Sequence, residues 1–297
     1  MPKVAIIGPG AIGGVVGAWL AQDADIDLSL CVRTPVERLR IETPDGVIEA
    51  APRVHLAPSH ARPVDWVLIA TKTYDAEAAA AWLPALAASG AYCAVLQNGV
   101  EHIERFAPFI ARQRIVPVIV DIPAERRAPG DIRQRRFGSL LAPESESGAA
   151  FAALFKRTPI AAATTADFTS AAWKKLCINC GGAIFALTRQ PSGIARRDDI
   201  RAAMLGLMQE CAAVGRAEGA RIDAAFLHEM VDRYRVGPAD SVNSILADRL
   251  AGRPMEIDAR NGVVVRLGAR HGIATPLNAF AVALLEAAGN YRPACGK

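Results

Sequence analysis

The chain has 297 residues, which is long for one domain at a typical length of about 150 residues, so we expect two domains. Its 34 basic and 30 acidic residues leave a formal net charge of only +4, and this slight, dispersed excess does not indicate a nucleic-acid partner. The six cysteines lack the spacing of a disulfide framework, which favours free thiols in a reducing compartment.

Two apolar stretches, residues 4–21 and 78–100, raise the question of a secretion signal or a membrane span. Regularly spaced glycines in the first stretch have no place in a signal peptide. Pro84, Ser89 and Gly90 divide the second into an alanine-rich helix, a turn and a strand. We therefore expect a cytoplasmic protein with no membrane partner.

The first third of the chain alternates strand and helix patterns. Residues 3–7 form an apolar run that predicts a strand, and residues 11–22 predict a helix directly after a glycine turn. Four more strands are predicted, at residues 28–32, 66–70, 92–97 and 115–120. Strands that alternate with helices are typical of a parallel sheet, here a doubly wound, Rossmann-type α/β domain.

An antiparallel hairpin appended to this sheet is predicted over residues 123–138, which are rich in Pro, Arg and Gly, and it ends near Leu141. It carries the densest basic run of the chain, Arg126, Arg127, Arg133, Arg135 and Arg136. No aromatic residues interleave these arginines, so we expect a solvated hairpin face; a nearby dinucleotide phosphate is the alternative.

From residue 166 onward only helical patterns remain. The predicted helices are residues 167–185, 200–218, 224–234, 241–250, 257–271 and 276–288. Thr275 precedes Pro276 and is expected to cap the last helix. The sequence thus predicts a Rossmann domain at residues 1–165 and an all-helical substrate and catalytic domain at residues 166–297, with substrate held between them.

The turn after the first strand reads Gly8, Pro9, Gly10, Ala11, Ile12, Gly13. Gly8 permits the tight bend, Gly10 lets the backbone approach a pyrophosphate, and Gly13 allows close packing of helix on strand. The free N–H groups at the start of the helix favour an anion. These features predict a dinucleotide site; a purely structural glycine turn is the alternative.

Arg33 ends the second predicted strand, about twenty residues beyond the glycines, where NAD-specific sites carry an acid. A guanidinium there can pair with a 2′-phosphate, which favours NADP. Lys72 and Asn98 follow the third and fourth strands, whose carboxyl ends meet at the same edge of a parallel sheet. They are candidate cofactor residues, and Asn98 a candidate substrate residue; exposed loop side chains are the alternative.

Lys175 and Asn179 are one helical turn apart, whereas Lys174 points about 100° away from that face. Reduction of a ketone leaves a developing alkoxide, which an ammonium group can stabilise and protonate. Cys177 and Cys180 lie in the same predicted helix, a position that disfavours redox chemistry for the pair. From spacing alone, a surface lysine is the favoured interpretation of Lys175.

The ordered motifs along the chain resemble those of the ketopantoate reductase (2-dehydropantoate 2-reductase) family. The matching segments are residues 8–13, Lys72, residues 97–99, residues 173–176 with 179–180, Ser244, residues 256–258 with 261–262, and residues 271–273 with Pro276. The resemblance spans almost the whole chain.

This resemblance implies NADPH-dependent reduction of a 2-oxo acid in pantothenate biosynthesis. Lys175 would be the proton donor, with Asn179 and Ser244 holding substrate, and Glu256 would lie near both nicotinamide and substrate. The cofactor roles of residues 8–13, Arg33, Lys72 and Asn98 agree with those given above. No metal is implied. Without the resemblance, Glu256 and Ser244 would be read as ordinary helix residues.

Three positions depart from the family pattern: Ala183, Ser192 and Ser241 stand where the family usually has asparagine. We expect a roomier, less polar pocket, which brings the hydroxyl-bearing substrate into question. A family member acting on a less hydroxylated 2-oxo acid, and a non-catalytic NADP-binding sensor, are the alternatives. The apolar helical half could also supply a homodimer face.

Overall fold

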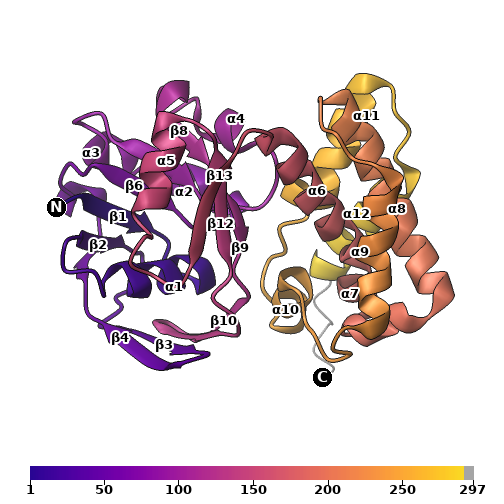
Figure 1. The fold of residues 1–297 in the computed structure, drawn as a ribbon, viewed down its shortest axis with the longest axis horizontal. Helices are drawn as coiled ribbons and strands as arrows, with labels where there is room; N and C mark the ends of the chain where they lie inside the picture. The colour runs from indigo at the N-terminus through magenta and orange to yellow at the C-terminus, as the bar shows by residue number, and fades with distance from the viewer. Residues whose placement is uncertain (291–297) are drawn as a thin grey trace, which may run out of the picture. The chain divides into compact units, whose positions relative to one another are not determined.

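The computed structural model describes residues 1–290 of the chain. The chain divides into two compact units, residues 1–168 and 169–297, where the sequence placed a boundary near 165 (Figure 1). Cys295 and the other residues of 291–297 lie outside the described part. Each unit has its own topology.

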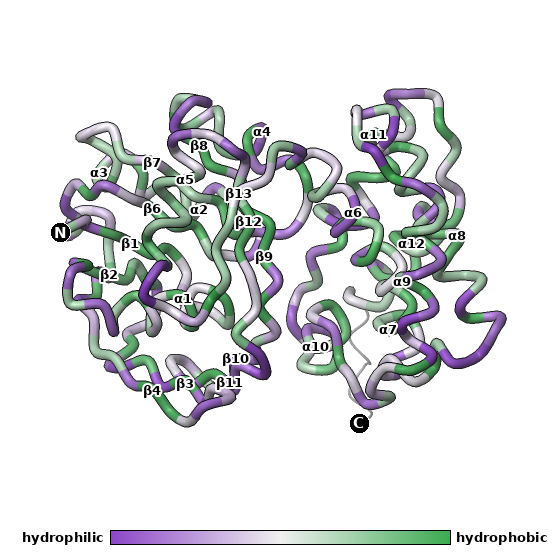
Figure 2. The backbone as a smooth tube through the Cα atoms, in the orientation of Figure 1, coloured by the Kyte–Doolittle hydropathy of each residue, from purple (hydrophilic) through white to green (hydrophobic). Residues whose placement is uncertain are grey.

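A six-stranded parallel sheet is the centre of the N-terminal unit. Its strands run in the order β5-β2-β1-β6-β7-β8. Their bounds are β1 Lys3–Ile7, β2 Asp27–Cys31, β5 Arg53–His55, β6 Trp66–Ile69, β7 Tyr92–Val95 and β8 Ile115–Pro117. Five of the six were predicted, within about three residues at their ends; β5 was not. The central strands are hydrophobic along their length (Figure 2), as expected of strands covered on both faces.

Helices cover both faces of this sheet. The helices of the unit are α1 Ala11–Leu20, α2 Ala76–Ala80, α3 Leu83–Leu86, α4 His102–Phe106 and α5 Glu146–Ala153. Val4 and Ile6 pack in one core with residues of α1 and α5, whereas Ala5 and Ile7 pack in another with residues of α2, α3 and α4. Because successive strand side chains point to opposite faces, one strand serves both cores. The doubly wound Rossmann-type fold is thus confirmed.

Two smaller sheets complete the unit. One has the order β10-β11-β3-β4, and the other β13-β12-β9. Their bounds are β3 Leu39–Thr43, β4 Gly46–Ala50, β9 Ile119–Asp121, β10 Ala124–Ala128, β11 Asp131–Gln134, β12 Ser139–Pro143 and β13 Ala161–Thr165. The predicted hairpin forms as β10 and β11, but it is not appended to the main sheet, because β11 pairs with β3 instead.

Carboxylates neutralise most of the basic run on this hairpin. Arg127 and Arg133 both reach Glu42, at 2.7 and 3.1 Å. Arg135 pairs with Glu125, and Arg136 with Asp121. These pairs are partly exposed and give little stability each, but they leave a hairpin face of mixed charge. These ion pairs agree with the solvated hairpin face that was predicted for the five arginines.

The described part of the C-terminal unit contains helices and no strand. Its elements are α6 Phe168–Gly181, α7 Ala183–Thr188, η4 Ser192–Arg196, α8 Asp198–Ala217, α9 Ala224–Val236, α10 Ser244–Leu250, the π-helical turn η5 Asp258–Gly262, α11 Val263–His271 and α12 Pro276–Asn290. The expected all-helical architecture is confirmed.

One long predicted helix is wrong, since residues 167–185 form two helices that break at Gly182. The Asn243 side chain donates to the Gly182 carbonyl at 2.9 Å, and a Cβ on residue 182 would lie only 2.6 Å from the Asn243 Nδ2. Glycine at this position admits the close approach. The break is thus contacted by a residue 61 positions further along the chain, which no local pattern could predict.

A buried amide network joins the helices. Asn261 Nδ2 donates to the Cys180 carbonyl of α6 and to the Asn278 side chain of α12, and Asn278 in turn donates to Glu210 of α8. Glu210 also accepts from the backbone N–H groups of Leu277 and Asn278. The start of α12 is thus capped by a carboxylate from another helix, where the sequence had suggested Thr275.

Five cysteines fall in the described part, and all five are buried free thiols. Cys177 and Cys180 lie within α6, with no exposed surface. Burial raises the pKa of Cys93 to about 12, so this thiol stays protonated. Among residues 1–290, no helix has the length and apolar character needed to cross a membrane.

Candidate active site

The glycine turn has the geometry that a dinucleotide requires. Gly8 has φ +82°, and its N–H donates to the carbonyl of Cys31, the last residue of β2. A Cβ on Gly13 would lie 2.5 Å from the Gly8 carbonyl oxygen, whereas a Cβ on Gly10 would meet nothing within 4 Å. Gly13 therefore serves packing, and Gly10 faces open space at the start of α1, which no side chain caps.

Arg33 lies just beyond the carboxyl end of β2 and is highly exposed, with 77% of its side chain accessible. Its guanidinium contacts both carboxylate oxygens of Asp75 at 3.3 and 3.4 Å, which are long distances for a charged pair. A phosphate at this position would meet an accessible guanidinium that is only loosely held by its carboxylate.

Gln97 fixes the neighbouring strand ends. Its side-chain amide donates to the carbonyls of Thr71 and Lys72 at 3.1 and 3.3 Å, and its Oε1 accepts from Arg105. Lys72 and Asn98 are both half-buried, each directly after a strand of the main sheet. No separate role for Gln97 was predicted, although its amide at a strand end beside the candidate residue Asn98 was a signal that could have identified it.

His102, the first residue of α4, is buried beneath the same turn. Its Nε2 lies 2.9 Å from the Gln97 carbonyl oxygen. Burial lowers the pKa of His102 to about 4, so the ring is neutral near pH 7 and donates its Nε2 proton to that carbonyl. His102 and Gln97 together hold the backbone on which Asn98 stands.

The two lysines of α6 have different surroundings. Lys174 Nζ lies 5.4 Å from the centre of the Phe226 ring of α9, which is a cation–π contact. Lys175 and Asn179 are both half-buried and lie one turn apart on α6. The structure thus places Lys174 against another helix and leaves Lys175 on the face that it shares with Asn179.

Ser244 and Arg260 lie next to Asn179 in the same unit. Arg260 Nη2 donates to the Asn179 carbonyl at 2.6 Å, and its Nη1 to the Ser244 Oγ at 3.3 Å. Ser244, the first residue of α10, is exposed, whereas Glu256 is 5% exposed and Arg260 is 2% exposed. Burial lowers the pKa of Arg260, while nearby charges that include Glu256 and Asp248 raise it. An arginine in this setting remains protonated.

Two of the family departures do not line an open pocket, contrary to the sequence expectation. Ala183 lies beyond the break at Gly182 and is fully buried against Ala186, Ile245 and Leu285. Ser192 is also buried, and its hydroxyl donates to the Pro238 carbonyl at 2.7 Å. Ser241 is exposed, and its carbonyl accepts from the Ser192 backbone N–H. Ala183 therefore packs in the core of the helical unit, and Ser192 stabilises a loop.

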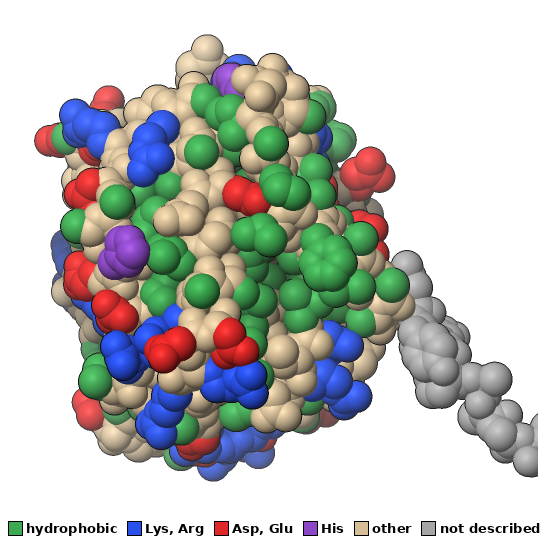
Figure 3. Space-filling model, turned by 90° about the vertical axis from the view of Figure 1, so that its right-hand side faces the viewer, with side chains coloured by type: hydrophobic (Ala, Val, Ile, Leu, Met, Phe, Trp, Pro, Cys, Tyr) green, Lys and Arg blue, Asp and Glu red, His purple; other side chains and the backbone are tan. Residues whose placement is uncertain are grey.

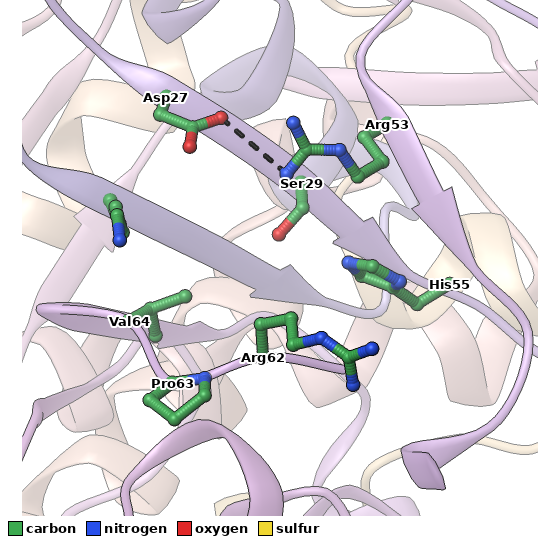
Figure 4. A pocket seen from close by; sticks show the side chains of 8 residues that line it. Asp27, Ser29, Arg53, His55, Arg62, Pro63 and Val64 are labelled. Carbon is green, nitrogen blue, oxygen red and sulfur yellow. Dashed lines mark ion pairs between the residues drawn. The ribbon is translucent and has the colours of Figure 1, made fainter. Parts of the chain in front are cut away.

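A separate pocket of about 180 Å³ lies toward the amino ends of the main strands. Lys3, Asp27 and Arg53, which line it, are the first residues of β1, β2 and β5. Figure 4 shows Arg53 paired with Asp27, and His55 and Arg62 beside them. Because the glycine turn follows the carboxyl end of β1, this pocket is not the dinucleotide site. No group of residues in the described chain is arranged to hold a metal ion.

A Rossmann-type sheet with this glycine turn, joined to an all-helical unit, defines a class of protein: the two-domain, pyridine-nucleotide-dependent oxidoreductases. Residues 4–146 match the family described as ketopantoate reductase PanE/ApbA, and residues 167–289 match the C-terminal part of the same family. The chain therefore belongs to the ketopantoate reductase family and is an enzyme.

Known relatives span nearly the whole chain. A 2-dehydropantoate 2-reductase from Caulobacter vibrioides is 53% identical over 288 residues, which are 97% of this chain and 99% of that protein. A PanE/ApbA family ketopantoate reductase from Ralstonia eutropha has a TM-score of 0.88 at 32% identity and covers 97% of this chain and 98% of its own. A dimeric ketopantoate reductase from Staphylococcus aureus, with a TM-score of 0.87, 24% identity and the same coverage, shares the fold.

Proposed function

We propose that this protein reduces a 2-oxo acid with NADPH in the cytoplasm, and that the 2-oxo acid is 2-dehydropantoate, which becomes pantoate in pantothenate biosynthesis. The observation that carries this proposal is the 53% identity to a 2-dehydropantoate 2-reductase across 97% of the chain. The half-buried Lys175 beside Asn179 supports it, because the reaction needs a proton donor.

The N-terminal unit provides the cofactor residues in this proposal. Gly8, Pro9, Gly10, Ala11, Ile12 and Gly13 form the turn that receives the pyrophosphate. Arg33 pairs with the 2′-phosphate in place of Asp75, Lys72 adds positive charge near the phosphates, and Asn98 donates to ribose, nicotinamide or substrate. The open space at Gly10 fits this role. When bound, NADPH supplies the hydride.

The helical unit provides the residues that act on substrate. As the keto carbon gains the hydride, its oxygen takes up the electron pair of the C=O π bond, and the Lys175 ammonium donates a proton to that oxygen. Asn179 and Ser244 hold the 2-oxo acid, in addition to the role of Asn98 given above, and Glu256 lies close to nicotinamide and substrate. The neutral amine of Lys175 then regains a proton from water.

A steady-state panel tests this function. NADPH oxidation is followed with 2-dehydropantoate and with 2-oxo acids that lack its hydroxyl group, and the panel is repeated with NADH. We expect 2-dehydropantoate with NADPH to give the highest kcat/KM. A higher kcat/KM for an acid without the hydroxyl would reassign the substrate but keep the chemistry. Tight NADPH binding without turnover on any acid would contradict the enzymatic proposal.

We also propose that the protein forms a homodimer through α12. Leu277, Phe280 and Leu284 recur at helical spacing on this element, and they are 44%, 64% and 43% exposed. Figure 3 shows hydrophobic side chains gathered on a face of the helical unit. An exposed apolar stripe of this kind is typical of an association surface, and the Staphylococcus aureus relative is a dimer.

A further inference from the structure

Arg260 is a buried charge without a carboxylate in contact. The only hydrogen bonds of its side chain are those to the Asn179 carbonyl and the Ser244 hydroxyl, and its Nε has no partner. None of the ion pairs within residues 1–290 includes it. Burying a guanidinium costs free energy that ion pairing usually offsets, so this position is expensive for stability alone. It also lies within the π-helical turn, a rare conformation that recurs at functional sites.

The direction of its hydrogen bonds sets the role of Ser244. A guanidinium can only donate, so the bond from Arg260 Nη1 occupies a lone pair of the Ser244 Oγ. The hydroxyl proton of Ser244 has no acceptor among the described residues, and the side chain is exposed. Ser244 is thereby left to donate outward. A 2-oxo acid presents only acceptors at its carboxylate and keto oxygens, which such a donor matches.

We infer that Arg260 is a positioning residue for substrate: it holds Ser244 and the Asn179 backbone so that the Ser244 hydroxyl donates to the carboxylate of the 2-oxo acid. This inference rests on the proposed function. It also explains why an arginine, and no apolar residue, occupies a buried position in the π turn. The competing explanation is purely structural, since Asn179 is near the end of α6 and its carbonyl needs a donor.

A double-mutant cycle separates the two explanations. For Arg260→Met we expect KM for the 2-oxo acid to rise about 10- to 100-fold, with kcat and the Kd of NADPH nearly unchanged. Ser244→Ala alone should raise KM about tenfold, but by less than about twofold when Arg260 is already Met, because the two side chains act as one unit. Arg260→Lys should restore part of the loss, since it keeps the charge with fewer donors.

Arg249→Met is the matched control. Arg249 donates to the carbonyls of Ala186 and Leu187 at the end of α7, so it caps a helix without touching Ser244 or Asn179. Its loss should lower Tm and leave KM as in the wild type. If Arg260→Met does not fold, Arg260→Lys replaces it in the cycle with Ser244→Ala.

The outcomes are distinct. A wild-type KM in the Arg260 variant, or KM effects that multiply in the double variant, would overturn the positioning role while the proposed function stands. A wild-type protein that turns over no 2-oxo acid would remove the proposed function, and this inference with it.

Discussion

Two neighbouring lysines of α6 are predicted to behave differently. Lys175 lies on the half-buried face with Asn179, whereas the Lys174 ammonium rests over the Phe226 ring. If Lys175 donates the proton, Lys175→Met should lower kcat by about 10²- to 10⁴-fold and leave the Kd of NADPH unchanged. Lys174→Met, the control of equal size, should change kcat less than about threefold. Equal effects of the two variants in steady-state assays would remove Lys175 from the mechanism.

Arg33 tests the choice of cofactor. Its exposed guanidinium is only loosely paired with Asp75, so it is available to a 2′-phosphate. Arg33→Ala should raise KM for NADPH about 10- to 100-fold and change KM for NADH little, because only NADPH carries that phosphate. Asp75→Asn should not weaken NADPH binding, since it removes a competing carboxylate. An equal rise in KM for NADPH and for NADH would indicate that Arg33 stabilises the fold and does not bind the 2′-phosphate.

At the scale of elements, two glycines of the turn before α1 are predicted to have different roles: Gly13 in packing and Gly10 in binding the cofactor. Gly13→Ala places a Cβ 2.5 Å from a backbone oxygen and should destabilise the protein by about 2 kcal/mol or more. Gly10→Ala meets no protein atom and should leave Tm almost unchanged, while NADPH binding weakens on the order of 10- to 100-fold. Thermal melts and fluorescence titrations measure both. Unchanged NADPH binding in Gly10→Ala would contradict the pyrophosphate site.

The contact between His102 of α4 and the Gln97 carbonyl, in the loop after β7, predicts a pH dependence. The pKa of His102 is about 4 in the folded protein, below its usual value of 6.5, so the unfolded chain takes up this proton first as the pH falls. The contribution of His102 to stability is therefore present above pH 6.5 and is lost between pH 6.5 and 4, by on the order of 3 kcal/mol.

Denaturant melts across this pH range check the prediction. His55 also has a lowered pKa, caused mainly by burial, so the wild type alone does not isolate His102. His102→Gln keeps an N–H donor but removes the titratable group. The unfolding free energy of this variant should therefore change less between pH 6.5 and 4 than that of the wild type. Identical pH profiles for the wild type and the variant would show that His102 is not the titrating group.

At the scale of the whole molecule, the exposed stripe of α12 predicts assembly. If it is a dimer interface, Phe280→Glu should shift the protein from dimer to monomer in size-exclusion chromatography with light scattering, because a buried unpaired carboxylate is costly. Phe109→Glu, at an exposed phenylalanine of the N-terminal unit, is the control and should leave the mass unchanged. A monomeric wild type would contradict the interface.

Local sequence patterns determined much of this protein. The strand β1 and the glycine turn at Gly8, Gly10 and Gly13 are formed by residues that are close together in the sequence. Periodicity and turn chemistry were therefore enough to predict them. The face shared by Lys175 and Asn179 likewise follows from the 3.6-residue repeat of a helix. By contrast, β3 and β5 were not predicted: β5 has only three residues, and β3 pairs both with the adjacent β4 and with the distant β11.

Only the tertiary structure decided the remaining features, because each depends on partners more than fifty residues apart. Asn243 donates to the Gly182 carbonyl at the helix break, Glu210 caps α12 where Thr275 was expected, and Arg260 reaches Asn179 from 81 positions away. Local patterns thus predicted most of the elements and the candidate proton donor Lys175, since backbone geometry and side-chain chemistry act locally. The burial and hydrogen bonds of Arg260 arise only when distant helices pack together, so no sequence motif predicted them.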